Sequence, residues 1–262
     1  MPITDMSLFR DYELARSVKP EVAAVYKLNH EQQTYDLAAQ KSMQYSRLDR
    51  GKKSIWQVLE ILGTIVDDSD PDTDLSQIQH ALQSAEAARK DHQPNWFILT
   101  CLIHDLGKLL ITFGEPQHFV VGDTFPLGLP FSSKIVYHEY FACNPDTKNP
   151  KYNNGLGMYT PNCGLDSVVM SFGHDEYLYH VVKKYLPKQA CFIIRYHSFY
   201  AGHTAGEYKE LLSQADVENM KWLKEFNKYD LYSKSANPVD LLAVKDYYQI
   251  LIAEFFPPEI DW

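Results

Sequence analysis

The sequence predicts an all-α protein in one domain, with one small β-hairpin as its only sheet. Apolar residues recur at helical spacing along most of the 262 residues, whereas the alternation typical of strands is almost absent. The composition shows no break, internal repeat or low-complexity tract that would divide the chain. A hydrophobic content of 45% is enough to form a sizeable core at this length.

The predicted elements follow from apolar spacing and from residues that begin or end helices. In chain order, we expect helices over 20–45, 54–66, 75–90, 95–113, 163–185, 188–200, 206–229 and 240–255. Asp74 is a candidate N-cap for the third helix, and Gly114 is a candidate C-cap for the fourth. The best strand signal, at 119–128, predicts the hairpin. Asn, Pro and Gly residues at 143–164 predict one long irregular connection.

Composition and charge exclude several classes of function. The formal net charge of −9 argues against a nucleic-acid partner or an anionic membrane. The N-terminal residues lack the basic region and apolar core of a secretory signal, and the apolar run at 96–103 is too short to span a bilayer. The four cysteines form no C-x-x-C pair. We therefore expect a reduced, cytoplasmic, monomeric protein with no nucleic-acid or membrane partner.

The segment CLIHDLGKLL places three ionisable side chains in an apolar helix. On a helical wheel, Cys101, His104, Asp105 and Lys108 share roughly a third of the circumference, with leucine and isoleucine opposite. Gly107 leaves the edge of this polar arc open to another backbone or to a ligand. Because burying an isolated charge is costly, these polar residues need partners elsewhere in the chain.

Four other helix-like segments carry an isolated candidate partner: His80, His174, His197 and Asp230. Taken singly, each histidine fits a hydrogen-bonded core residue and Asp230 fits a helix end. The adjacent His104–Asp105 pair fits a structural role less well, because a buried carboxylate needs a strong counter-charge. Together the set offers four imidazoles and two carboxylates, which suit iron, manganese or zinc. Six ligands exceed the need of one tetrahedral zinc but suit two octahedral ions that share a carboxylate.

The order of these residues along the chain resembles the metal signature of HD domains. His80, the His104–Asp105 pair and Asp230 match the basic signature, and His174 and His197 resemble the additions in its dinuclear versions. Longer strings are more specific than the HD pair. The following are similar, in order and along nearly the whole chain, to strings of the myo-inositol oxygenase family: DDSDPDTD, HDLGK, FGEPQ, VVGDTFP, MSFGHDEY, RYHSFY and EFNKYDLY.

The resemblance implies an HD-like helical bundle over residues 1–262 that holds two iron ions. Such an enzyme opens the ring of myo-inositol with dioxygen and forms D-glucuronate and water. One iron would be held by His80, His104, Asp105 and Asp230, and the other by His174 and His197, with Asp105 bridging. The working state in this family is mixed-valent, with one Fe(II) and one Fe(III). Residues 1–19 would cover the active site.

The resemblance also implies which residues recognise the substrate. An uncharged polyol offers only hydroxyl groups, so its pocket needs charged and polar groups at fixed positions. The implied substrate contacts are Arg10, Asp67, Ser69, Lys108, Gly122, Asp123, His197 and Ser198, and the implied catalytic residues are Lys108 and Asp105. Two of these have ordinary alternatives: Arg10 could form a surface salt bridge, and Lys108 could extend to solvent.

The acidic loop VDDSDPDTD at 66–74 is not a calcium site of the EF-hand type. The frame that begins at Asp68 has Thr73 where the EF-hand has glycine, and Gln79 where it has the bidentate glutamate. The frame that begins at Asp70 fails at the same two positions, which are occupied by Leu75 and Ala81. A solvated turn explains the acidic residues that the resemblance does not assign to substrate.

Three other functions are alternatives to the oxygenase interpretation. An HD-type phosphohydrolase would use metal-activated water, but its anionic substrate calls for several cations, and the nearby segments offer chiefly Lys108 and Arg195. No P-loop occurs in the chain. A dinuclear HD oxygenase acting on a phosphonate is disfavoured by the same shortage of cations. A non-catalytic helical interaction protein would hold no stoichiometric metal.

Overall fold

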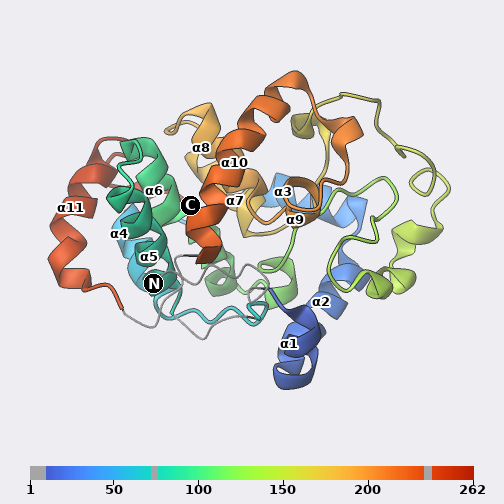
Figure 1. The fold of residues 1–262 in the computed structure, drawn as a ribbon, viewed down its shortest axis with the longest axis horizontal. Coiled ribbons are helices and arrows are strands. Elements are labelled where there is room, and N and C mark those ends of the chain that lie inside the picture. Colours follow the sequence, from blue (N-terminus) through green and yellow to red (C-terminus); the bar gives the residue numbers. More distant parts are fainter. Residues whose placement is uncertain (1–9, 72–75, 233–237) are drawn as a thin grey trace.

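The computed structural model describes residues 10–71, 76–232 and 238–262. It is mostly helical, which confirms the prediction of an all-α, HD-like protein (Figure 1). Its α-helices are α1 (Tyr12–Val18), α2 (Pro20–Gln32), α3 (Tyr35–Tyr45), α4 (Ile55–Leu62), α5 (Gln77–Lys90), α6 (Asn95–Ile103), α7 (His174–Val182), α8 (Lys188–Tyr196), α9 (Tyr200–His203), α10 (Gln214–Tyr232) and α11 (Leu241–Ala253). Its 3₁₀ helices are η2 (Leu106–Phe113), η3 (Gln117–Phe119), η4 (His138–Cys143), η5 (Pro145–Lys148), η6 (Leu165–Ser167) and η7 (Lys209–Leu211).

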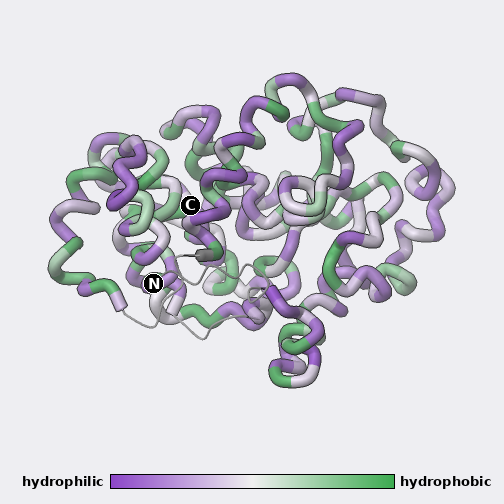
Figure 2. The backbone as a smooth tube through the Cα atoms, viewed as in Figure 1, coloured by the Kyte–Doolittle hydropathy of each residue, from purple (hydrophilic) through white to green (hydrophobic). Residues whose placement is uncertain are grey.

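The main core lies between helices that are distant in sequence. α5 packs on α6, α7 packs on α8, and α10 contacts α5, α6 and α8. Leu99, Leu102 and Phe226 are fully buried in this core. Hydrophobic and hydrophilic residues both occur along outer helices such as α11 (Figure 2). The buried residues of α11 that join the core are Tyr248, Leu251 and Ile252. The inner faces of α5, α6, α7, α8 and α10 therefore converge on one region, where the candidate site is built.

The helix predicted at 95–113 is divided at the His104–Asp105 pair. α6 ends at Ile103, and the chain continues as the tighter helix η2. Gly114 ends η2 in the left-handed conformation, with φ of 90°, which confirms the predicted C-cap. By length and composition alone the stretch could cross a membrane, but 78% of its most apolar window is buried inside the protein. Its apolar character is explained by its place in the core.

Several predicted boundaries are wrong because tertiary hydrogen bonds decide them. The helix expected over 20–45 is broken at Gln33, whose buried side-chain amide donates to the carbonyl oxygen of Phe172 and accepts from its backbone N–H. The Thr34 side chain then caps α3. The helix expected over 163–185 begins only at His174, and the one expected from 206 begins at Gln214. The predicted cap Asp74 lies outside the described residues.

No hairpin forms at 119–128, so that prediction is wrong. The segment instead pairs with distant backbone: the N–H of Leu127 donates to the carbonyl oxygen of Val169, and the N–H of Ser171 donates to that of Phe125. The sheet found among the described residues joins β1 (Lys52–Lys53) to β2 (Ile260–Asp261) in antiparallel register. The connection at 143–164 is irregular apart from η5, as predicted.

Candidate metal centre and active site

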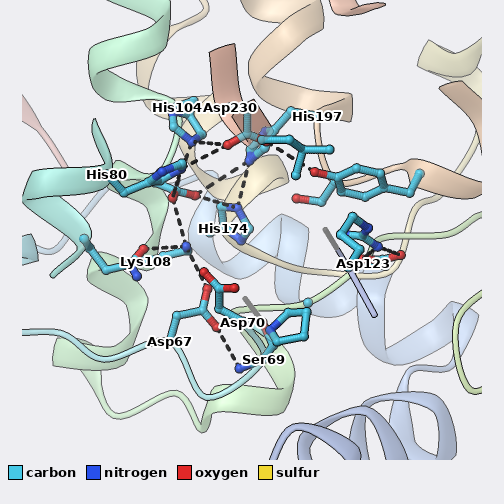
Figure 3. Close-up of a pocket in the computed structure, with 18 of the residues that line it drawn as sticks. Asp67, Ser69, Asp70, His80, His104, Lys108, Asp123, His174, His197 and Asp230 are labelled. Atoms are coloured by element: carbon cyan, nitrogen blue, oxygen red, sulfur yellow. Dashed lines mark hydrogen bonds and ion pairs between the residues drawn. The ribbon is translucent and has the colours of Figure 1, made fainter. Parts of the chain in front are cut away.

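The six predicted metal ligands meet at the ends and inner faces of five helices. Figure 3 labels five of them: His80, His104, His174, His197 and Asp230. All six side chains are buried. His80 lies in α5 and Asp230 in α10; His104 is the C-cap of α6, with Asp105 directly after it; His174 begins α7; and His197 is the C-cap of α8. The structure therefore brings together side chains that are up to 150 residues apart in sequence.

Asp105 lies between two groups of histidines. Its Oδ2 is 3.4 Å from Nε2 of His104 and 3.9 Å from Nε2 of His80. Its Oδ1 faces the other way, 3.2 Å from Nε2 of His174 and 3.7 Å from Nε2 of His197. In each group the candidate ligand atoms lie within 4.8 Å of one another. The arrangement can hold two metal ions that share the Asp105 carboxylate.

Asp230 belongs to the first of these groups. Its Oδ1 lies 3.0 Å from Nε2 of His80 and 3.4 Å from Nε2 of His104. The first group thus offers two imidazoles and two carboxylates, and the second offers two imidazoles and the shared carboxylate. This donor set of nitrogen and oxygen fits iron, manganese or zinc.

Backbone carbonyl groups orient three of the imidazoles. Nδ1 of His104 lies 2.9 Å from the carbonyl oxygen of Cys101, and Nδ1 of His197 lies 2.9 Å from that of Ile194. Nδ1 of His174 lies 2.7 Å from the carbonyl oxygen of Val120. A carbonyl oxygen can only accept, so Nδ1 carries the proton in each ring and Nε2 is left as the donor atom for a metal.

The electrostatics of the site favour a bound cation. Burial lowers the pKa of His104, but Asp105 and Asp230 outweigh it and raise that pKa to about 10. Burial likewise lowers the pKa of His174, and Asp175 and Asp105 raise it to about 10. Burial raises the pKa of Asp105, yet Lys108 and His104 hold it well below its ordinary value. The carboxylates are therefore ionised, and in the protein without metal they draw protons onto the imidazoles.

Metal binding is expected to release protons. Below about pH 10 the metal-free protein carries an extra proton on His104 and on His174, and a metal ion must displace both. Affinity should therefore fall as the pH falls, by up to about 100-fold per unit for filling the whole centre. Titration with Mn²⁺ in buffers of different ionisation enthalpy measures the released protons. Affinity independent of pH between 6 and about 9 would contradict this assignment.

One cavity collects all the substrate contacts that the resemblance implies, together with the six candidate ligands. Its lining includes Arg10, Asp67, Ser69, Lys108, Gly122, Asp123, His197 and Ser198. Polar and charged groups predominate, as a pocket for a small polyol requires. Every residue that the sequence predicted as a substrate contact or metal ligand lines this cavity.

The comparison with known proteins decides the family. The family model described as myo-inositol oxygenase matches residues 19–262. The chain belongs to the myo-inositol oxygenase family. It is 51% identical to inositol oxygenase 1 of Arabidopsis thaliana, over 97% of this chain and 84% of the relative. It is 47% identical to inositol oxygenase of Dictyostelium discoideum (97% and 89%) and 44% identical to that of Mus musculus (97% and 90%).

In this member of the myo-inositol oxygenase family, Lys108 is buried and does not extend to solvent. Its ammonium group lies 2.9 Å from Oδ2 of Asp105, 2.8 Å from Oδ2 of Asp67 and 2.7 Å from Oε1 of Gln77. Burial lowers the pKa of Lys108, but Asp105 and Asp67 raise it above its ordinary value, so the group stays charged. Lys108 thus connects the shared carboxylate to the loop that carries Asp67 and Ser69.

Arg10 reaches into the cavity and does not form a surface salt bridge. One guanidinium nitrogen lies 2.7 Å from each carboxylate oxygen of Asp123, which is buried. The same guanidinium lies over the ring of Tyr200, 3.4 Å from its centroid. The Tyr200 hydroxyl in turn donates to Oδ2 of Asp230, at 3.3 Å. The described start of the chain is therefore joined to a candidate metal ligand.

Sequence reasoning missed several residues of the site. Tyr12, Tyr26, Asp70, Gln77 and Tyr200 also line the cavity. Gln77 lies one turn before His80 on the same helix face, so helical spacing could have revealed it. The tyrosines carry no local signal. The other histidines, interpreted as structural or surface residues, do not line the cavity: His30, His92, His118, His138, His180 and His203.

Gly107 permits η2 to lie against the start of α7. A Cβ atom there would lie 2.0 Å from the carbonyl oxygen of His174, so Gly107→Ala must push these elements apart. We expect a loss of stability of at least about 3 kcal/mol and loss of metal from the His174 group. Thermal melting and metal analysis measure both. Gly173→Ala is the control, because its Cβ would meet nothing nearer than 3.5 Å. A Gly107→Ala protein with unchanged melting and metal content would contradict this account.

Proposed function

We propose that this protein is an inositol oxygenase, which opens the ring of myo-inositol with dioxygen and forms D-glucuronate and water. One observation carries the proposal: Asp105 lies between two histidine groups, in a cavity lined with groups that recognise hydroxyls. Membership of the myo-inositol oxygenase family supports the choice of substrate. The names of the relatives from plants, an amoeba and a mammal support it further.

The proposed cofactor is a pair of iron ions in a mixed-valent state. His80, His104 and Asp230 would hold one ion, His174 and His197 the other, with Asp105 shared. Bound there, the ions would supply the redox chemistry with dioxygen and make a coordinated hydroxyl more acidic. Conversion of the polyol to an aldehyde acid removes four electrons, and one dioxygen accepts four on going to water. No organic redox cofactor is needed to balance the reaction.

The side chains around the metals bind and orient the substrate. The Lys108 ammonium is held charged beside Asp105, and it can donate to a substrate oxygen near the metals when that oxygen replaces one of its acceptors Asp105, Asp67 and Gln77. Asp67 and Asp123 carry carboxylate oxygens that accept from hydroxyl groups. Arg10 also lines the cavity, where its ion pair with Asp123 and its contact with the Tyr200 ring hold it in place. These groups position the polyol before oxygen reacts.

The phosphohydrolase alternative fits the cavity less well. Among the described residues, the lysines and arginines in its lining are Arg10 and Lys108, and each is paired with a carboxylate there. Arg195 pairs with Glu176 and Asp166 and does not line the cavity. Apart from the metal ions themselves, a dianionic phosphoester or phosphonate would therefore find few cationic partners in this lining, each already paired with a carboxylate.

Oxygen consumption tests the proposed function. Protein loaded with ferrous iron and a reductant, then freed of excess reductant, is supplied with air and myo-inositol. We expect oxygen uptake that depends on myo-inositol, with one glucuronate formed per dioxygen consumed. Release of phosphate from a phosphoester without air, together with no oxygen uptake on myo-inositol, would overturn the proposal.

We also propose that the working form is a monomer in the cytoplasm. The four cysteines are all free thiols, which supports a reducing compartment. Light scattering of the iron-loaded protein tests the oligomeric state, and fluorescence microscopy of a tagged chain tests the location. A stable dimer in solution, or a tagged chain in a secretory compartment, would contradict these two proposals.

A further inference from the structure

A buried carboxylate next to the second histidine group has no role in the mechanism above. Asp175 follows His174 in α7 and is 1% exposed. Its Oδ1 lies 2.8 Å from Nε2 of His174 and 3.6 Å from Nε2 of His197. Burying a carboxylate is costly unless its lone pairs are used, so its other contacts identify what it does.

Asp175 holds Ser198 by two hydrogen bonds. The backbone N–H of Ser198 donates to Oδ2 at 3.2 Å, and its hydroxyl donates to Oδ1 at 3.1 Å. An ionised carboxylate can only accept, so the single hydroxyl proton of Ser198 is directed toward Asp175. The oxygen of Ser198, which lines the cavity, is then left with lone pairs for a ligand.

A second serine in the lining of the cavity is held in a similar way. Oδ1 of Asp67 accepts from the backbone N–H of Ser69 at 2.8 Å and from its hydroxyl at 2.6 Å. Ser69 also lines the cavity. Both serines therefore present acceptors, whereas Lys108 and Arg10 present donors. The carboxylates that accept the serine hydroxyl protons therefore set the direction of these hydrogen bonds.

We propose that Asp175 is a positioning residue that fixes Ser198 as the acceptor of a hydrogen bond from one hydroxyl of the polyol substrate. This inference rests on the proposed function and deepens it, because it states what the cavity demands of that hydroxyl. A ligand with fluorine at this position can accept but cannot donate, and two acceptors would then face each other. The cavity would then discriminate against the fluorinated ligand because the Ser198 oxygen is left without a hydrogen-bond donor, and not because the shape of the ligand differs.

Calorimetric binding of myo-inositol to the anaerobic, iron-loaded protein tests the proposal without turnover. Asp175→Asn keeps the shape but offers an amide that can donate to Ser198. At matched iron content, we expect binding at least about fivefold weaker in Asp175→Asn and in Ser198→Ala. Because Asp175 acts through Ser198, the double variant should bind no more weakly than Ser198→Ala alone. Wild-type affinity in Asp175→Asn, or effects that multiply in the double variant, would overturn the proposal.

The chain offers a matched control for a merely structural role. Asp216 is also buried and accepts from both the backbone N–H and the hydroxyl of Ser213, each at 2.8 Å, but it does not line the cavity. Asp216→Asn should leave binding unchanged, whatever its effect on melting temperature. If Asp175→Asn also left the binding of myo-inositol unchanged, Asp175 would have only a structural role and the proposal would fail.

Fluorinated ligands give a test that does not depend on the folding of Asp175→Asn. Inositols with each hydroxyl replaced in turn by fluorine are titrated into the wild type and Ser198→Ala. At one position, the loss of affinity should be large in the wild type and much smaller in Ser198→Ala. If no position depends on Ser198 while myo-inositol itself binds, this inference alone is wrong. If the wild type binds no myo-inositol, the proposed function is wrong as well.

Discussion

Replacement of Asp105 by alanine is expected to remove both metal ions and with them all oxygenase activity. The two oxygens of this carboxylate face different histidine groups, Oδ2 toward His104 and Oδ1 toward His174. A terminal ligand serves one ion, whereas a shared ligand serves two. Its charge also raises the pKa of His104 and of His174, so its loss weakens the field that attracts cations. Elemental analysis after anaerobic loading and desalting measures the ions retained.

Two variants separate this effect from general damage. Asp230→Ala removes a carboxylate that contacts the histidines of one group, His80 and His104, so it should weaken one ion and spare the other. Asp216→Ala removes a buried carboxylate outside the cavity and should keep both ions. If Asp105→Ala retained its full metal content, Asp105 could not be the shared ligand.

Replacement of Lys108 by alanine should abolish most turnover while the metal ions stay bound. Its ammonium group contacts Asp105 and Asp67 but is not a candidate ligand, and bound cations would themselves compensate the charge of Asp105. Losing a buried charged hydrogen bond to a substrate costs about 2–5 kcal/mol, which appears as a lower kcat/KM. Steady-state kinetics at full metal loading measure this loss.

The matched control for Lys108 is Lys41. Lys41 also forms a short ion pair, with Nζ 2.6 Å from Oε2 of Glu115, but it does not line the cavity. Lys41→Ala should keep kcat/KM close to that of the wild type. Nearly normal kcat/KM in Lys108→Ala would show that the substrate does not depend on this ammonium group.

Local sequence patterns predicted helices well where apolar spacing is strong. They failed where hydrogen bonds to distant backbone groups determine the local structure. α4, α8 and α11 begin within one residue of their predicted starts. The break at Gln33 depends on bonds to Phe172, 139 residues away. The segment 119–128 reads as a hairpin because its apolar residues suit strands, yet its backbone partners lie near 170. No window along the chain contains that information.

The candidate ligands and most of the residues that line the cavity could be predicted from the sequence, because the strings that resemble the family carry them in the same order along the chain. The supporting residues could not be predicted this way. Asp175 stands beside His174 in sequence, but only the fold shows that Ser198 is its partner. Tyr200 is likewise identified only by the fold, which places the Arg10 guanidinium over its ring. Such contacts join distant segments, so neither spacing nor composition reveals them.

Anomalous diffraction at the iron absorption edge tests most directly whether Asp105 lies between two metal ions. Crystals of the protein are loaded with ferrous iron without air, and data are collected above and below the edge. We predict two anomalous peaks on opposite sides of the Asp105 carboxylate, one beside His80, His104 and Asp230 and the other beside His174 and His197. A single peak at full loading, or two peaks that do not share Asp105, would contradict the account.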